Sequence, residues 1–184
     1  MSQSAAAPEK MDRWRPRLEG RDAPRIGIAW SGRPRQGEFR NRPIALRLLA
    51  PILQIPGLRF VALQKELREG DAELLQSYPH VLNLGAELED FTDTAAILSQ
   101  LDLVISVDTS VAHLAGALGK PVWILLQFSA DWRWLLERHD SPWYPSARLF
   151  RQPAAGEWES VVERVRAVLK TMFPGSQPPH NGRV

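Results

Sequence analysis

The chain has 184 residues, the length of one domain, with 44% hydrophobic residues, 24% charged residues and no cysteine. These values exclude disulfides, thiolate zinc sites and cysteine nucleophiles, and the longest apolar run, Val122–Leu126, is too short to cross a membrane. Residues 1–25 lack the apolar core of a signal peptide, so we expect a cytoplasmic protein. The net charge of +2 is uneven, because residues 1–42 carry ten Lys and Arg against five Asp and Glu. This basic excess favours an anionic ligand. A phosphorylated small molecule is the favoured ligand, because it needs fewer positive charges than nucleic acid and the sequence has no nucleic-acid-binding motif.

The two ends of the chain have the composition of irregular segments. Three prolines and a glycine interrupt the polar residues 1–24, which predicts a flexible N-terminal segment. Residues 174–184 contain three prolines and two glycines, which predicts a disordered tail. The folded domain is therefore expected over residues 25–173.

Strand and helix signals alternate between these two segments. Short apolar runs predict buried strands, and apolar residues at helical spacing predict helices. In chain order, the predicted elements are a strand over Arg25–Trp30, a helix over Ala45–Gln54, a strand over Leu58–Leu63, a helix over Asp71–Ser77, a strand over Val81–Leu84, a helix over Asp93–Leu101 with Thr92 or Asp93 as its N-cap, a strand over Leu103–Val107, a helix over Val111–Leu118, strands over Val122–Leu126 and Ala147–Phe150, and a helix over Trp158–Met172. This alternation predicts an α/β fold, a doubly wound parallel sheet of the Rossmann-like type with helices on both faces.

Polar side chains gather directly after the predicted strands. In open parallel sheets, ligands bind at the carboxyl ends of the strands. The polar residues at these ends are Ser31 and several arginines after the first strand, Gln64 and Lys65 after the second, and Asp108, Thr109 and Ser110 after the fourth. Their coincidence with the strand ends predicts a binding site at this edge of the sheet.

The segment Val107–Pro121 predicts an anion site. A strand runs directly into a helix whose first turn contains Thr109 and Ser110, and free N–H groups at a helix start attract anions. His113 lies four residues after Thr109, on the same helix face, and can donate an N–H to a phosphate oxygen. The carboxylate of Asp108 would repel a phosphate, so it either caps the helix or accepts hydrogen bonds from sugar hydroxyls. A plain N-cap pair without a ligand is the alternative interpretation.

The loop over residues 31–42 is a second candidate for phosphate binding. Gly32 allows a ligand to approach the backbone, and arginines such as Arg33 and Arg42 bind diphosphates in bidentate fashion. A solvated basic loop is the alternative interpretation. If this loop faces the helix start at Thr109, one diphosphate can bridge both.

Several motifs of other enzyme classes are missing from the sequence. It contains no DxD triplet and no His, Asp and Glu cluster with metal-ligand spacing, so we expect neither a metal nor a cofactor. No GxGxxG motif follows the first strand, which disfavours dinucleotide redox chemistry. There is also no GxSxG elbow and no P-loop.

The aromatic residues 128–144 include three tryptophans. The favoured interpretation is that these side chains close the core at the edge of the sheet. The alternative is a wall that stacks against a base or a sugar.

Five segments of the chain resemble a known protein family. They are GIAWSGRP at 27–34, RNRPIAL at 40–46, FVALQK at 60–65, LDLVISVDTSVAHLAGALGKPVWILL at 101–126 and DWRWLLERHDSPWYPSARLFRQ at 131–152. These segments are similar to the C-terminal half of bacterial glycosyltransferase-like proteins, which are often fused to tetratricopeptide repeats. That group is related to the ADP-heptose:lipopolysaccharide heptosyltransferases of glycosyltransferase family nine.

The resemblance implies a single C-terminal, donor-binding domain of the metal-independent GT-B architecture. By the resemblance, Asp108, Thr109 and His113 would hold the donor, with Ser110 at a position where the family has glycine. Ser31 and the arginine-rich loop match the family's phosphate-contacting first loop. The acceptor-binding N-terminal domain, which in this family usually supplies the catalytic base, is expected from another part of the protein or from a partner chain.

The sequence therefore predicts a glycosyltransferase donor-binding domain that binds a nucleotide-diphosphate sugar for inverting, metal-independent transfer. The expected phosphate ligands are Ser31, Gly32, Arg33, Arg42, Thr109, Ser110 and His113, and the expected sugar or ribose ligands are Asp108, Gln64 and Lys65. No residue is assigned as catalytic base, so activity of the isolated chain is left open. Two alternatives are a non-catalytic nucleotide-sugar binding or interaction module and a sugar-nucleotide epimerase-like domain.

Overall fold

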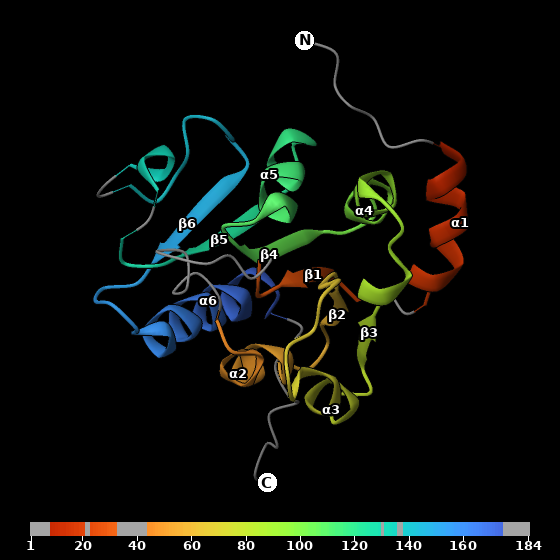
Figure 1. Cartoon of the computed structure of the whole chain (residues 1–184), viewed down its shortest axis with the longest axis horizontal. Helices are drawn as coiled ribbons and strands as arrows, with labels where there is room; N and C mark the ends of the chain where they lie inside the picture. The colour runs from red at the N-terminus through yellow and green to blue at the C-terminus, as the bar shows by residue number, and fades with distance from the viewer. Residues whose placement is uncertain (1–7, 21–22, 33–43, 130, 136–137, 175–184) are drawn as a thin grey trace, which may run out of the picture.

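A computed structural model describes residues 8–20, 23–32, 44–129, 131–135 and 138–174, which form a six-stranded sheet with flanking helices (Figure 1). The strands are β1 (Arg25–Ala29), β2 (Arg59–Ala62), β3 (Val81–Asn83), β4 (Leu103–Val107), β5 (Val122–Leu126) and β6 (Ala147–Arg151). They lie in the order β3-β2-β1-β4-β5-β6, and the neighbouring strands pair in parallel. This is the doubly wound order of Rossmann-like domains, so the predicted fold class is confirmed.

Helices cover both faces of the sheet (Figure 1). One face carries α2 (Ala50–Leu53), α3 (Asp71–Gln76) and α6 (Trp158–Met172), and the other carries α4 (Phe91–Leu98) and α5 (Ser110–Ala117). Successive strand residues point to opposite faces. Phe60 and Leu103 therefore pack into the core with α6, while Val61 and Val104 pack into the core with α4 and α5. Burial on both faces explains why the strands are apolar nearly throughout.

The helix expected over Asp93–Leu101 lies earlier in the chain, as α4 (Phe91–Leu98), because Asp90 is its N-cap. The Asp90 carboxylate accepts hydrogen bonds from the backbone N–H groups of Thr92 and Asp93 at 2.8 and 3.0 Å. The prediction of Thr92 or Asp93 as the N-cap is therefore wrong, since both residues already belong to the first turn that Asp90 caps.

The segment expected to form one helix over Ala45–Gln54 is divided in the structure. It forms a 3-10 helix, η2 (Leu46–Leu49), followed by the four-residue α2. Pro51 stands in the first turn of α2, where a missing N–H is tolerated. Within a continuous α-helix, its ring would clash with the carbonyl of Arg47, which disfavours a single helix over this segment.

Residues 8–18 correct the prediction of an irregular N-terminal segment. They form α1 (Pro8–Leu18), which packs beside α4 (Figure 1). Trp14 and Leu18 are buried in the core that α4 and α5 cover. Pro16 lies inside the helix and most of its other residues are polar, so the sequence carries little helical signal. Packing against α4 supplies the stability that intrinsic propensity does not.

Polar contacts with a buried carboxylate fix α1 to α4. The Trp14 indole N–H donates to Asp93 Oδ1 at 3.1 Å, and Lys10 Nζ lies 3.1 Å from the same oxygen. Burial opposes ionisation of Asp93, but the hydrogen bonds from Trp14 and Lys10 outweigh it and lower the pKa of this carboxyl below its usual range. Arg17 adds a salt bridge to Glu87 in the loop before α4.

None of the helices in the described ranges combines the length and the apolar character that crossing a membrane requires. The predicted tail, apart from Pro174, lies outside the described residues.

Candidate functional site

The strand order reverses between β1 and β4, and we call this position the switch point. From β1 the chain moves outwards to β2 and β3, and then returns to place β4 on the other side of β1. Ala29 at the end of β1 pairs with Ser106 near the end of β4. Open α/β sheets bind their ligands outside the carboxyl ends of the strands at such a reversal. The segments that leave these two strands are Ser31–Gly32 and Asp108–Ser110.

The structure brings these two predicted segments together. A Cβ atom placed on Gly32 would lie 3.5 Å from Thr109 Cγ2, and no other described atom outside the neighbouring residues comes within 4 Å of it. Ser31 is buried and donates its backbone N–H to Gln64 Oε1 at 3.0 Å. The end of β1 is therefore held firmly, with its glycine beside the start of α5.

The start of α5 differs from the start of α4 in how it is capped. Thr109 is the N-cap, with an extended backbone, but within the described chain its side chain makes no capping hydrogen bond. Its hydroxyl lies 3.0 Å from the hydroxyl of Ser106 instead. Ser110, the first helical residue, is exposed. The N–H groups of the first turn are thus not satisfied by Thr109, whereas Asp90 satisfies those of α4.

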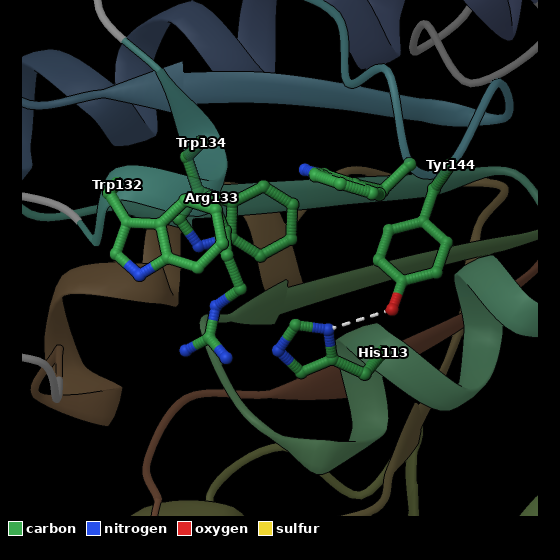
Figure 2. Close-up of a pocket in the computed structure, with 6 residues that line it drawn as sticks. His113, Trp132, Arg133, Trp134 and Tyr144 are labelled. Atoms are coloured by element: carbon green, nitrogen blue, oxygen red, sulfur yellow. Dashed lines mark hydrogen bonds between the residues drawn. The ribbon is translucent and has the colours of Figure 1, made fainter.

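His113 is engaged at both ring nitrogens. Its Nε2 lies 3.3 Å from Asp108 Oδ1, and its Nδ1 lies 3.0 Å from the hydroxyl of Tyr144 (Figure 2). Its ring stacks on Trp134, with centroids 5.5 Å apart and planes 21° from parallel. In this arrangement, His113 links the carboxylate that follows β4 to a group of aromatic side chains. To bind a phosphate through Nε2, His113 would have to give up its contact with Asp108.

Gln64 and Lys65, predicted as sugar or ribose ligands, have other partners in the structure. Gln64 is buried, and its amide spans from the Ser31 N–H to the carbonyl oxygen of Glu66. The ammonium group of Lys65 donates to the Glu89 carbonyl oxygen at 3.2 Å. Gln64 therefore supports the backbone at the end of β1, and Lys65 reaches towards the loop before α4. Arg33 and Arg42 lie outside the described residues.

A pocket of about 240 Å³ lies beyond His113 (Figure 2). It is lined by His113, by Trp132, Arg133 and Trp134 of the turn η4 (Trp132–Trp134), and by Trp143 and Tyr144 from the loop before β6. We call these six residues the aromatic pocket. Trp134 is 1% exposed, but Trp132 and Trp143 are 73% and 60% exposed. The prediction that the tryptophans close the core is therefore correct for Trp134 and wrong for the other two.

Sequence reasoning missed how the aromatic pocket is attached to α5. A Cβ atom on Gly116 would lie 2.5 Å from Tyr144 Cγ, so the absence of a side chain at Gly116 is what lets Tyr144 pack against the helix. The signal was present as a small-residue helix followed by an aromatic segment, but spacing alone does not pair the two. Among the described residues, no three His, Asp or Glu side chains are grouped to hold a metal ion.

Comparisons with known proteins relate this chain to glycosyltransferases. Residues 49–134 match the model of glycosyltransferase family 9 (heptosyltransferase). The matched range contains Thr109, His113 and the turn η4, but not Gly32 or Tyr144. The chain is also 32% identical over 171 residues to the protein FlbA of Caulobacter vibrioides, covering 89% of this chain and 28% of FlbA.

Solved structures of heptosyltransferases share the fold. The E. coli ADP-heptose LPS heptosyltransferase II matches with a TM-score of 0.66 and 15% identity over 94% of this chain and 53% of its own. The family 9 glycosyltransferase of Veillonella parvula matches with a TM-score of 0.65 and 14% identity, over 92% of this chain and 53% of its own. The chain thus spans about half the length of these structures and 28% of FlbA. It has the glycosyltransferase fold of the heptosyltransferase type.

Proposed function

We propose that this chain is the donor-binding domain of a glycosyltransferase and that it binds the diphosphate of a nucleotide sugar at the switch point. The observation that carries the proposal is the meeting of Gly32, which has no side chain, with the first turn of α5 at Thr109, whose side chain makes no capping hydrogen bond within the described chain. Backbone N–H groups at a helix start and an open approach to the backbone are what a diphosphate requires. The match of residues 49–134 to a glycosyltransferase family supports the same chemistry.

The proposed reaction is a direct displacement at the anomeric carbon of the sugar. The bond from this carbon to the diphosphate oxygen breaks as the acceptor oxygen attacks from the opposite face, which inverts the configuration. Negative charge develops on the departing diphosphate, and the N–H groups of α5 and the hydroxyl of Ser110 stabilise it. We propose that no metal ion takes part, so that binding in the presence of EDTA equals binding in its absence.

Other parts of the protein or a partner chain complete the proposed enzyme. Arg33 and Arg42 remain sequence predictions for the cationic contacts to the diphosphate. Asp108, which contacts His113, is proposed to orient the donor sugar or ribose. The acceptor-binding domain, the catalytic base and any tetratricopeptide repeats are proposed to lie outside this chain, which spans about half of the heptosyltransferase structures it matches.

One substitution tests the contacts that Ser110 is proposed to make through its backbone N–H and its hydroxyl. Ser110→Pro removes the first N–H of α5, and proline is well tolerated at the first position of a helix. Thr109, the preceding residue, already has the extended backbone (φ −138°, ψ 173°) that a following proline requires. We expect S110P to weaken binding of UDP, ADP or GDP at least tenfold in calorimetry, because a charge-assisted hydrogen bond contributes about 1.5–3 kcal/mol.

Phe91→Pro is the matched control. Phe91 is the first residue of α4, follows an N-cap with a similarly extended backbone (φ −143°, ψ −178°), and is 61% exposed. This variant should leave both nucleotide affinity and thermal stability unchanged. If S110P binds nucleoside diphosphates as tightly as the unmodified chain does, or if the unmodified chain binds none of them, the proposed function is wrong.

A further inference from the structure

The aromatic pocket has a composition that the proposed diphosphate site does not explain. Two large indole side chains, Trp132 and Trp143, line this pocket of about 240 Å³ and remain mostly exposed. Single exposed apolar side chains are common, but two indoles exposed together on one concave surface are typical of a site that a ligand or partner covers. The pocket therefore indicates an occupant.

The occupant must be held mainly through an apolar face. Two polar groups of the pocket have partners, since the hydroxyl of Tyr144 contacts His113 and Arg133 Nη2 lies 2.9 Å from Asp131 Oδ2. Arg133 Nε and Trp134 Nε1 are buried without a hydrogen-bond partner among the described residues, but the accessible lining of the pocket is mostly apolar. A molecule that needed hydrogen bonds on every side would lose those it makes with water and find few replacements. A ring with one apolar face, whose polar groups point outwards to solvent, meets no such penalty.

His113 connects the aromatic pocket to the proposed diphosphate site. It lines the pocket, and it lies one helical turn, about 5.4 Å, beyond the start of α5. In a nucleotide sugar, the sugar is bonded to the outer phosphate, and the ribose, which also carries the base, is bonded to the inner phosphate. A pocket of about 240 Å³ accommodates the single ring of the sugar more readily than a ribose together with its base.

We propose that the aromatic pocket binds the glycosyl ring of the nucleotide-sugar donor, an inference that rests on the proposed function. One face of a pyranose presents C–H bonds, and these pack against the electron-rich face of an indole. Trp132 and Trp143 supply these faces at the open side of the pocket, while Trp134 and His113, stacked at 5.5 Å, form its inner wall. The sugar hydroxyls extend past the indoles into water.

Calorimetry with paired probes separates the sugar from the nucleotide. The probes are UDP with UDP-glucose, ADP with ADP-glucose, and GDP with GDP-mannose, each titrated into the full chain. Trp132→Ala and Trp143→Ala remove exposed side chains, so both variants should keep the fold. For any pair that binds, each substitution should weaken binding of the sugar-bearing probe about tenfold and alter binding of the free diphosphate less than twofold.

Phe91→Ala is the control, because Phe91 is a similarly exposed aromatic residue that does not line the pocket. It should alter the affinity of neither probe. Equal losses for both members of a pair would place the nucleoside in the pocket and overturn the inference. No loss for either member, or no pair whose sugar-bearing member responds, would also overturn it while leaving the diphosphate site intact. If none of the three free diphosphates binds the unmodified chain, the proposed function itself fails.

Discussion

His113 Nε2 lies 3.3 Å from Asp108 Oδ1, so an imidazole one turn into α5 is held by the carboxylate that directly follows β4. The opposite ring nitrogen contacts the Tyr144 hydroxyl at 3.0 Å. This histidine is therefore fixed from two sides, between the switch point and the aromatic pocket. Its side chain contacts residues of both regions.

His113→Ala should weaken nucleoside-diphosphate binding more than tenfold, because it removes the imidazole that lies beside the proposed diphosphate site and holds Asp108 in place. The fold should persist, since the His113 side chain is 32% exposed. Calorimetry measures the affinity, and circular dichroism checks the fold. His80→Ala, which removes a ring that contacts the Leu53 carbonyl at 2.8 Å instead, is the control. Unchanged affinity in H113A would remove this residue from the site.

Two substitutions at Gly32 test whether a larger side chain there blocks the proposed diphosphate site. A single methyl group would make an ordinary contact of 3.5 Å with Thr109, so Gly32→Ala should keep the stability of the unmodified chain. Gly32→Val places further methyl groups where the diphosphate is proposed to lie, and it should weaken nucleotide binding at least tenfold. Thermal unfolding and calorimetry on both variants provide the comparison. Equal affinities for G32V and the unmodified chain would contradict a ligand at this position.

Gly116→Ala should displace Tyr144, which lines the aromatic pocket and packs against α5 at Gly116. The added methyl group would approach three Tyr144 atoms at 2.5–3.0 Å, so Tyr144 must move. We expect a loss of about 1–3 kcal/mol in the free energy of unfolding, as for other overpacked sites. Chemical denaturation measures the change, with Gly32→Ala as a glycine substitution that meets no such obstacle. Unaltered stability would show that Tyr144 is not packed against α5 in this way.

Asp93→Asn should change how stability depends on pH. The pKa of Asp93 is lower in the folded chain than in the unfolded chain, so the folded state binds fewer protons. The ionised Asp93 carboxylate therefore contributes its full stabilisation above the pKa of the unfolded chain, about 3.9, and this contribution is lost as the pH falls through the lower pKa of the folded chain. Thermal unfolding between pH 7 and pH 2 should show a weaker pH dependence for D93N. It should also show a lower melting temperature at pH 7, because the contacts of Trp14 and Lys10 are impaired.

The control for the acid experiment is Asp140→Asn. Asp140 is also paired, with Arg138 Nη2 at 2.7 Å, but its side chain is 67% exposed. Exposed pairs contribute little to stability, so D140N should follow the unmodified chain closely at each pH. If D93N and D140N behave alike, the buried carboxylate does not anchor α1.

The sheet and the position of α6 could be predicted because buried positions recur as apolar residues at the spacing of a strand or a helix. The strand at 103–107 is apolar nearly throughout, and the helix over Trp158–Met172 has the predicted bounds. The proximity of Gly32 to Thr109 also followed from the rule that the carboxyl ends of parallel strands meet at one edge of the sheet. These features depend on local pattern and on the general geometry of parallel sheets.

Other features depend on tertiary contacts that a single sequence does not reveal. Helix α1 is stabilised by Trp14 and Lys10 binding a carboxylate far along the chain. Gln64 looks like a ligand residue at a strand end, but its amide is used to hold the backbone of Ser31. Trp132 is exposed and Trp134 is buried, although both belong to the same short turn. The sequence does not distinguish them, because they are the same residue type two positions apart.

The parallel pairing of β1 with β4 also determines when the switch point can form during synthesis. Ile26 pairs with Leu103, so the first strand waits for a partner that is synthesised much later. Contacts between residues so distant in the chain are slow to form. A nascent polypeptide that has emerged from the ribosome only as far as β3 has one half of the sheet and lacks β4 and α5, where the diphosphate is proposed to bind. If the proposed function holds, binding of a nucleoside diphosphate reports a late stage of folding, after β1 and β4 have paired.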